Sequence, residues 1–135
     1  TSAMIKQMES FKTNNPNKYK EIYDDIAYIV ETLIDRWKSN DEENILDSIR
    51  KNKDILHQLT KESGVGIETP ALRSLSEIAE KYEAAGKLSG AGGGDCMIAV
   101  APEDKIEAVK QGIAKAGGQV IEVETNVEGV RIESK

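Results

Sequence analysis

Four of the five residues from Gly90 to Gly94 are glycine, and this run lies between Lys87-Leu88-Ser89 and Asp95-Cys96. Glycine loses more conformational entropy on ordering than any other residue, so a folded domain keeps such a run where the backbone takes positive φ angles or approaches another group closely. Successive backbone N–H groups in that conformation converge into a concave anion site. A tight loop between two strands, with no ligand, explains the same composition equally well.

The glycine run matches neither standard nucleotide fingerprint. A Walker loop needs Gly-Lys-Ser/Thr after its glycines, and none follows Gly94. The dinucleotide pattern G-x-G-x-x-G also fails, because Asp95 stands at its last position when the count starts at Gly90, and Met97 when it starts at Gly92. Any phosphate site in this segment therefore belongs to another class.

The residues before the glycine run have the periodicity of helices. A short helix is expected up to Asn14-Asn15-Pro16, and the apolar residues from Tyr19 to Trp37 recur at i, i+3 and i+4. Ser39-Asn40-Asp41 offers capping oxygens for a third helix, which should pack antiparallel to the second. Thr69-Pro70 begins another, because proline is favoured at the first helical position. The part from about 1 to 86 is predicted to be helical.

The remaining part, about 87 to 135, is predicted to form a sheet. Residues 87–89 read as a short strand end, and Cys96 to Ala101 is apolar on both faces, which predicts a covered central strand with Cys96 buried. A helix should follow Pro102, and alternation over Val120–Thr125 and Val130–Glu133 predicts two further strands around a hairpin. The prediction is one α+β domain over 1–135, with N-terminal helices packed on a small, mainly antiparallel, four-stranded sheet.

Charge and composition exclude several classes of protein. The net charge is −6, and the basic residues are spread among more numerous acids, which argues against a nucleic-acid partner. No apolar run approaches the ~20 residues of a membrane span, so no membrane partner is expected. The single cysteine, Cys96, forms no internal disulfide and no multi-cysteine metal framework, which favours a cytoplasmic location and predicts no metal site.

The segment from Lys87 to Val100, KLSGAGGGDCMIAV, resembles the third conserved motif of the galactokinase, homoserine kinase, mevalonate kinase and phosphomevalonate kinase (GHMP) superfamily. Its Gly-Gly-Gly-Asp-Cys ending resembles the phosphomevalonate kinase branch, as do the approach through Ile67–Leu72 and the opening Thr1-Ser2. The resemblance spans nearly the whole chain, although only the glycine loop is highly specific.

The resemblance implies the C-terminal domain of a two-domain kinase that transfers the γ-phosphate of ATP to phosphomevalonate, in isoprenoid precursor synthesis. ATP and Mg²⁺ would be bound mainly by an N-terminal domain outside this chain, so the chain is read as a piece of a longer protein with no catalytic residue of its own. The residues expected to form the phosphate loop are Ser89, Gly90, Ala91, Gly92, Gly93, Gly94 and Asp95. Ser2 and Lys87 are weaker candidates for substrate contacts.

Several alternatives stay open at this point. Asp95 is interpreted as support for the loop rather than a neighbour of Mg²⁺, Ser89 either donates to a phosphate or caps the loop, and Lys87 is either an anion contact or a solvated charge at a strand edge. His57 is expected to be a surface residue. The competing functions are a mevalonate kinase or diphosphomevalonate decarboxylase domain, and a non-catalytic anion-binding α+β module. We also expect an exposed apolar patch beside the loop and self-association of the separated domain.

Overall fold

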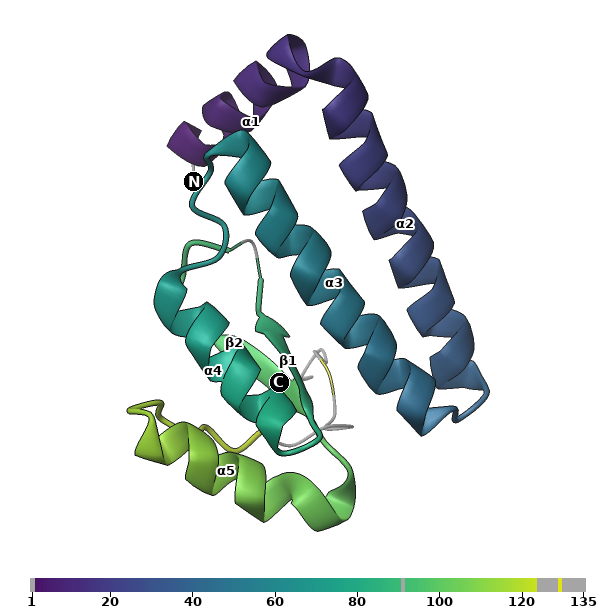
Figure 1. The fold of residues 1–135 in the computed structure, drawn as a ribbon, viewed down its shortest axis with the longest axis vertical. Helices are drawn as coiled ribbons and strands as arrows, with labels where there is room; N and C mark the ends of the chain where they lie inside the picture. The colour runs from purple at the N-terminus through teal and green to yellow at the C-terminus, as the bar shows by residue number, and fades with distance from the viewer. Residues whose placement is uncertain (1, 91, 124–128, 130–135) are drawn as a thin grey trace, which may run out of the picture.

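The computed structural model of the chain describes residues 2–90, 92–123 and 129. Its elements, in chain order, are α1 (Ser2–Asn14), α2 (Pro16–Lys38), α3 (Glu42–Ser63), α4 (Pro70–Lys81), β1 (Ala85–Leu88), β2 (Met97–Val100), a short 3-10 helix η1 (Glu103–Lys105) and α5 (Ile106–Lys115) (Figure 1). The part of the chain that the structure describes contains no helix long and apolar enough to cross a membrane.

The predicted helices all form, and their ends follow local chemistry. Asp41 caps α3 by accepting from the backbone N–H of Asn44, and the Thr69 hydroxyl caps α4 by accepting from Leu72 N at 3.2 Å. Gly64 ends α3 with a φ of 69°, in the left-handed region that glycine favours at this position. The starts of α3 and α4 therefore lie where the sequence predicted them.

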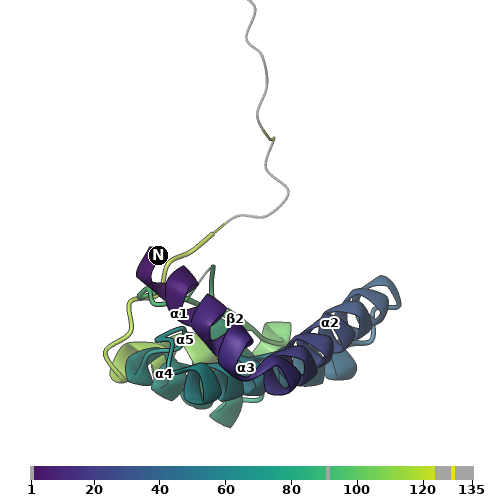
Figure 2. The same cartoon turned by 90° about the horizontal axis from the view of Figure 1, so that it is seen from above.

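Helices α2 and α3 pack side by side as an antiparallel hairpin (Figure 1). The main apolar cluster joins α1, α2, α3, α4 and β1, and its buried members are Phe11, Ile22, Leu59, Val65, Ile67, Leu72 and Leu88. Seen from above, α2, α3 and α4 lie roughly in one layer (Figure 2). The short connection from α3 to α4 thus contributes Val65 and Ile67 to this core.

Strands β1 and β2 form a two-stranded antiparallel sheet in which Ala85 pairs with Val100 and Lys87 with Ile98. Strand β1 lies very close to α4. A Cβ atom placed on Gly86 would lie 2.9 Å from the Cα of Ser76, so only glycine permits this approach. The sheet is thereby fixed against the helical layer at the point where the glycine loop begins.

Of the four predicted strands, the described residues form two, β1 and β2. Residues 120–123 of the predicted third strand do not form a strand, and Ile121 and Val123 are 68% and 80% exposed. Residues 124–125, 130–133 and most of the intervening turn lie outside the described residues. The coarser prediction is correct, because the described chain is α+β and mostly helical, with a small antiparallel sheet.

The prediction of a covered central strand was wrong for the described part of the chain. Ile98 is 46% exposed, Ala99 is exposed, and Cys96 is exposed rather than buried. The physical reason is that β2 pairs with β1 alone among the described strands, so it is an edge strand with one incompletely covered face.

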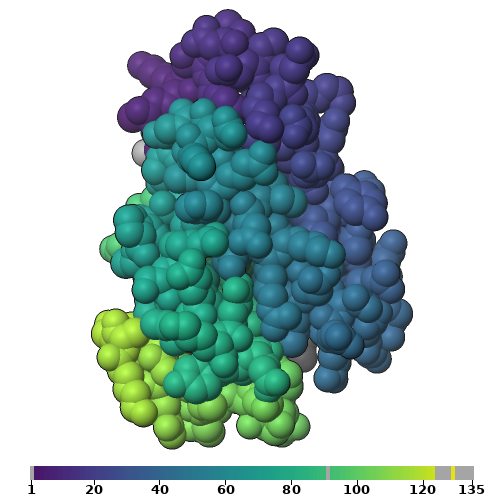
Figure 3. Space-filling view, viewed as in Figure 1, coloured from purple at the N-terminus to yellow at the C-terminus, as the bar shows by residue number. Residues whose placement is uncertain are grey.

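A row of exposed apolar side chains runs along α2, which forms one flank of the molecule beside α3 (Figure 3). Tyr23, Val30, Ile34 and Trp37 are 38–59% exposed and recur at the spacing of one helix face. Ile5, which follows Met4 on α1, is 54% exposed. The exposed apolar row therefore follows α2, and the predicted apolar patch beside the glycine loop stays a prediction.

Candidate functional site

The glycine-rich loop connects β1 to β2. Ser89 N donates to Cys96 O at 3.1 Å and closes its base. Within it, Gly90, Gly92 and Gly93 have φ angles of 71°, 81° and 66°. Non-glycine residues rarely adopt these values, so the conformation requires the glycines. Ala91 lies outside the described residues.

The loop rests on the connection between α3 and α4, which we call the shelf (residues 64–68). Gly93 N donates to Ile67 O at 2.7 Å. A Cβ atom on Gly92 would lie 2.6 Å from both Ile67 O and Ile67 Cγ2, and one on Gly93 would lie 3.2 Å from Gly66 O. Position 92 therefore requires glycine for two reasons, its positive φ and its close contact with the shelf.

The backbone N–H groups of the loop divide into two kinds. Gly93 N–H is used to hold the loop on the shelf, whereas the N–H groups of Gly92, Gly94 and Asp95 donate to no acceptor among the described residues. Gly94 and Asp95 are exposed. The loop thus presents unused donors next to an anchored one, which is the arrangement that an anion-binding backbone needs.

Helix α1 begins beside the loop. A Cβ atom on Gly93 would lie 3.3 Å from Met4 Sδ, so the first turn of α1 adjoins the loop. Ser2, a predicted contact, opens that turn and is exposed. The first N–H groups of a helix have no intrahelical partner and carry partial positive charge. The structure therefore brings Ser2 and the glycine loop to the same region.

Lys87 lies two residues before the loop and is half-buried on β1. Its Nζ donates to Leu88 O at 3.0 Å, and burial lowers the pKa of its ammonium group. No carboxylate lies within 4.0 Å of this Nζ in residues 2–90, 92–123 and 129. A partly desolvated cation without an acidic partner favours a nearby anion.

The predicted roles of Ser89 and Asp95 stay predictions. Both residues are exposed, and the described residues show no side-chain hydrogen bond for either. In the described ranges, no three His, Cys, Asp or Glu side chains gather in a way that would hold a metal ion. The site therefore offers backbone N–H groups and one lysine, which suits an anion rather than a bare cation.

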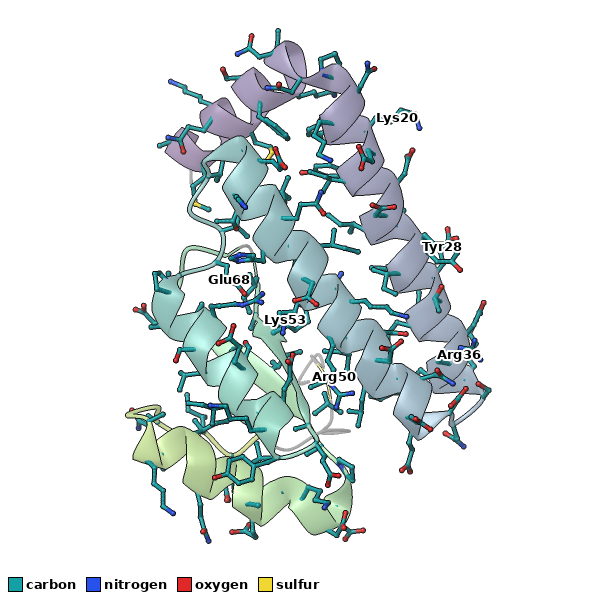
Figure 4. The ribbon with its side chains drawn as sticks, in the orientation of Figure 1. Lys20, Tyr28, Arg36, Arg50, Lys53 and Glu68 are labelled. Atoms are coloured by element: carbon teal, nitrogen blue, oxygen red, sulfur yellow. The ribbon has the colours of Figure 1, made fainter. Side chains whose placement is uncertain are left out.

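Sequence reasoning missed the charged residues that hold the shelf. His57 is at the surface as expected, with 48% of its side chain exposed, but its Nδ1 lies 2.7 Å from Oε2 of Glu68, whose side chain is 2% exposed. Glu68 lies between α3 and α4 (Figure 4). The only sequence signal was an acidic residue between buried Ile67 and the Thr69 cap.

A second charged pair, with one buried partner, joins α3 directly to α4. Lys53 on α3 is 3% exposed and pairs with Glu80 on α4, and Arg50 donates to the backbone oxygens of Glu83 and Ala84. Figure 4 shows Arg50 and Lys53 along the α3 side facing α4. Lys53 therefore joins α3 to α4, and Arg50 joins α3 to the residues that follow α4.

The comparisons with known proteins show the family of the chain. A model of the family described as GHMP kinases C terminal matches residues 29–119. The chain is 31% identical over 100 residues to a phosphomevalonate kinase from Streptomyces sp., covering 74% of the chain and 27% of that protein. It is 33% identical over 135 residues to a mevalonate kinase from Thermococcus gammatolerans, covering 98% of the chain and 40% of that protein. The chain thus spans well under half the length of these relatives.

Two solved structures share the fold. The crystal structure of a Lin0012 protein from Listeria innocua superposes with a TM-score of 0.80 at 33% identity, covering 86% of this chain and 33% of that one. The crystal structure of L. major mevalonate kinase in complex with R-mevalonate gives a TM-score of 0.74 at 22% identity, covering 84% of this chain and 34% of that one. The second likeness shows the fold alone.

Proposed function

The chain belongs to the GHMP kinases C-terminal family, and from that membership we propose that it is the C-terminal domain of an ATP-dependent kinase whose acceptor is phosphomevalonate. The observation that carries the proposal is the loop at Gly90–Gly94, with three positive-φ glycines and unused N–H donors. ATP with Mg²⁺ supplies the phosphoryl group when bound, mainly to parts of the kinase outside this chain.

In this proposal, each part of the loop has a separate task. Gly93 fixes the loop on Ile67, and the N–H groups of Gly92, Gly94 and Asp95 donate to a phosphate oxygen. The first turn of α1, with Ser2, adds positive partial charge, and Lys87 adds a full charge nearby. Phosphoryl transfer depends mainly on positioning and on neutralising charge, so a preorganised backbone cradle is a suitable contribution.

The choice of acceptor rests on the residues after the glycines. The Asp95-Cys96 ending resembles the phosphomevalonate kinase branch, and a relative from Streptomyces sp. has that name. The alternative acceptor is mevalonate, because mevalonate kinases from Thermococcus gammatolerans and Thermococcus sibiricus match 98% of the chain.

We extend the proposal to the rest of the domain. The predicted four-stranded sheet is kept as a proposal for the domain within the whole kinase. The remainder of the kinase would also cover apolar side chains that are exposed here, so the separated chain would tend to self-associate.

A coupled assay of ADP release tests the proposal. With ATP and Mg²⁺, the complete polypeptide that contains this chain should turn over phosphomevalonate in the kinase range of ~1–100 s⁻¹. The 135-residue chain alone should show no turnover, because it has no candidate catalytic residue. Equal or faster turnover of mevalonate would assign the alternative acceptor, and activity with neither acceptor would contradict the proposed function.

A further inference from the structure

We infer that Glu68 is a positioning residue for the glycine-rich loop, acting through the peptide unit that joins Ile67 to Glu68. The inference rests on the proposed function, since it assigns how the phosphate-binding conformation is held. Glu68 itself contacts neither the loop glycines nor any ligand. Its effect is to fix the shelf on which Gly92 and Gly93 lie.

One planar peptide unit links the helices to the loop. Its N–H, from Glu68, donates to the Thr60 hydroxyl at 3.2 Å, and its carbonyl, from Ile67, accepts from Gly93 N at 2.7 Å. Because a peptide unit is rigid, a rotation that disturbs one bond disturbs the other. The orientation of the Ile67 carbonyl that anchors Gly93 therefore depends on how residue 68 is held.

Residue 68 is held in part by its side chain, which contacts side chains on two helices. Its Oε2 lies 2.7 Å from Nδ1 of His57 on α3 and 4.0 Å from Nη1 of Arg73 on α4. A carboxylate only accepts, so His57 is the donor in the first pair. His57 and Thr60 lie within one turn of α3, so the side chain and the backbone N–H of Glu68 are held by the same helix surface.

The burial of Glu68 is costly for folding. Its side chain is only 2% exposed, and its Oε1 has no hydrogen-bond partner among the described residues. A buried carboxylate with an unsatisfied oxygen is less favourable than an apolar side chain of similar volume. Stability alone therefore does not explain a glutamate here, whereas a role in orienting the shelf does.

The test compares two isosteric variants that share a partner. Glu77 also pairs with Arg73, with 2.8 Å between Glu77 Oε1 and Arg73 Nε. Glu77 is exposed and lies away from the shelf. Glu68→Gln and Glu77→Gln each remove one charge beside the same guanidinium. Only the first weakens the hold on the Ile67–Glu68 peptide unit, so differences between the variants report on the loop rather than on Arg73.

We expect Glu68→Gln to shift the amide ¹H–¹⁵N resonances of Gly92, Gly93 and Gly94 in the 135-residue chain, and Glu77→Gln to leave them in place. In the complete kinase, Glu68→Gln should lower kcat/KM about 10-fold or more, since small misplacement of a binding group costs up to roughly 10²-fold in rate. Glu77→Gln should stay within about 2-fold. Circular dichroism should show both variants folded.

A second pair of variants decides the matter if Glu68→Gln does not fold. His57→Leu removes the hydrogen-bond donor at a half-exposed position, so the amide resonances of the loop glycines should shift. His57→Gln keeps a donor there, so those resonances should lie close to their wild-type positions. Unmoved glycine amides in Glu68→Gln or His57→Leu, or equal shifts in Glu77→Gln, would overturn the inference. Wild-type protein without any kinase activity would instead overturn the proposed function, because the amide readout needs no turnover.

Discussion

Replacing Gly92 by valine should lower kcat/KM of the complete kinase by roughly 10²–10³-fold, the range found when one preorganised hydrogen-bond donor is lost from a site. Gly92 has a φ of 81°, which a β-branched residue adopts only with strain. Its first side-chain carbon would also lie 2.6 Å from Ile67 O, the atom that accepts from Gly93. The loop must therefore leave the shelf, and its donors move with it.

Two neighbouring glycines provide matched controls for Gly92→Val. Gly94→Ala keeps the backbone N–H, meets no protein atom within 4 Å and needs no positive φ, so its kcat/KM should fall much less than that of Gly92→Val. Gly90→Ala also meets nothing but has a φ of 71°, so it should show an intermediate loss that comes from strain alone. Steady-state kinetics and circular dichroism would measure all three. Near-normal kcat/KM in folded Gly92→Val would show that the glycines only make a turn.

Replacing Ile22 by alanine should lower the free energy of unfolding of the chain by about 2–5 kcal/mol, as for other fully buried large-to-small changes. Ile22 is 0% exposed in the cluster that also contains Val65 and Ile67. The cavity would form in the apolar cluster that α2 shares with α1 and α3. Urea unfolding followed by circular dichroism would measure the loss.

Ile34→Ala is the control on the same helix. Ile34 is 47% exposed on the apolar row along α2, so its truncation should change the unfolding free energy by about 0.5 kcal/mol or less. Equal losses in the two variants would contradict the assignment of which face of α2 is buried. A large loss in Ile34→Ala alone would indicate that this row is covered by another copy of the chain in solution.

The helical part was predictable because its signals are local. The periodicity of α2 and α3, the Asp41 and Thr69 caps, and the prolines Pro16 and Pro70 all act within a few residues. The sheet was not predictable to the same extent, because the burial of a strand depends on neighbours far along the chain. The apolar Cys96–Ala101 segment has the composition of a central strand, yet β2 pairs only with β1 in the described residues.

The same distinction holds for the site. The glycine loop was recognisable because its composition is locally costly, and its positive φ angles follow from that composition. The shelf was not, because the contacts of Gly93 with Ile67 and of His57 with Glu68 join separate segments. Nothing in the sequence around His57 distinguishes it from a solvated surface residue, and only the folded chain brings Glu68 beside it.

The most direct test of the central claim, that this loop holds a phosphate group, is a crystal structure of the complete kinase with a non-hydrolysable ATP analogue, Mg²⁺ and phosphomevalonate. We expect a phosphate oxygen within about 3.2 Å of at least two of the backbone nitrogens of Gly92, Gly94 and Asp95, with Gly93 N still bonded to Ile67 O. Ordered ligands that bind elsewhere, with no phosphate oxygen within hydrogen-bond distance of the loop, would contradict it.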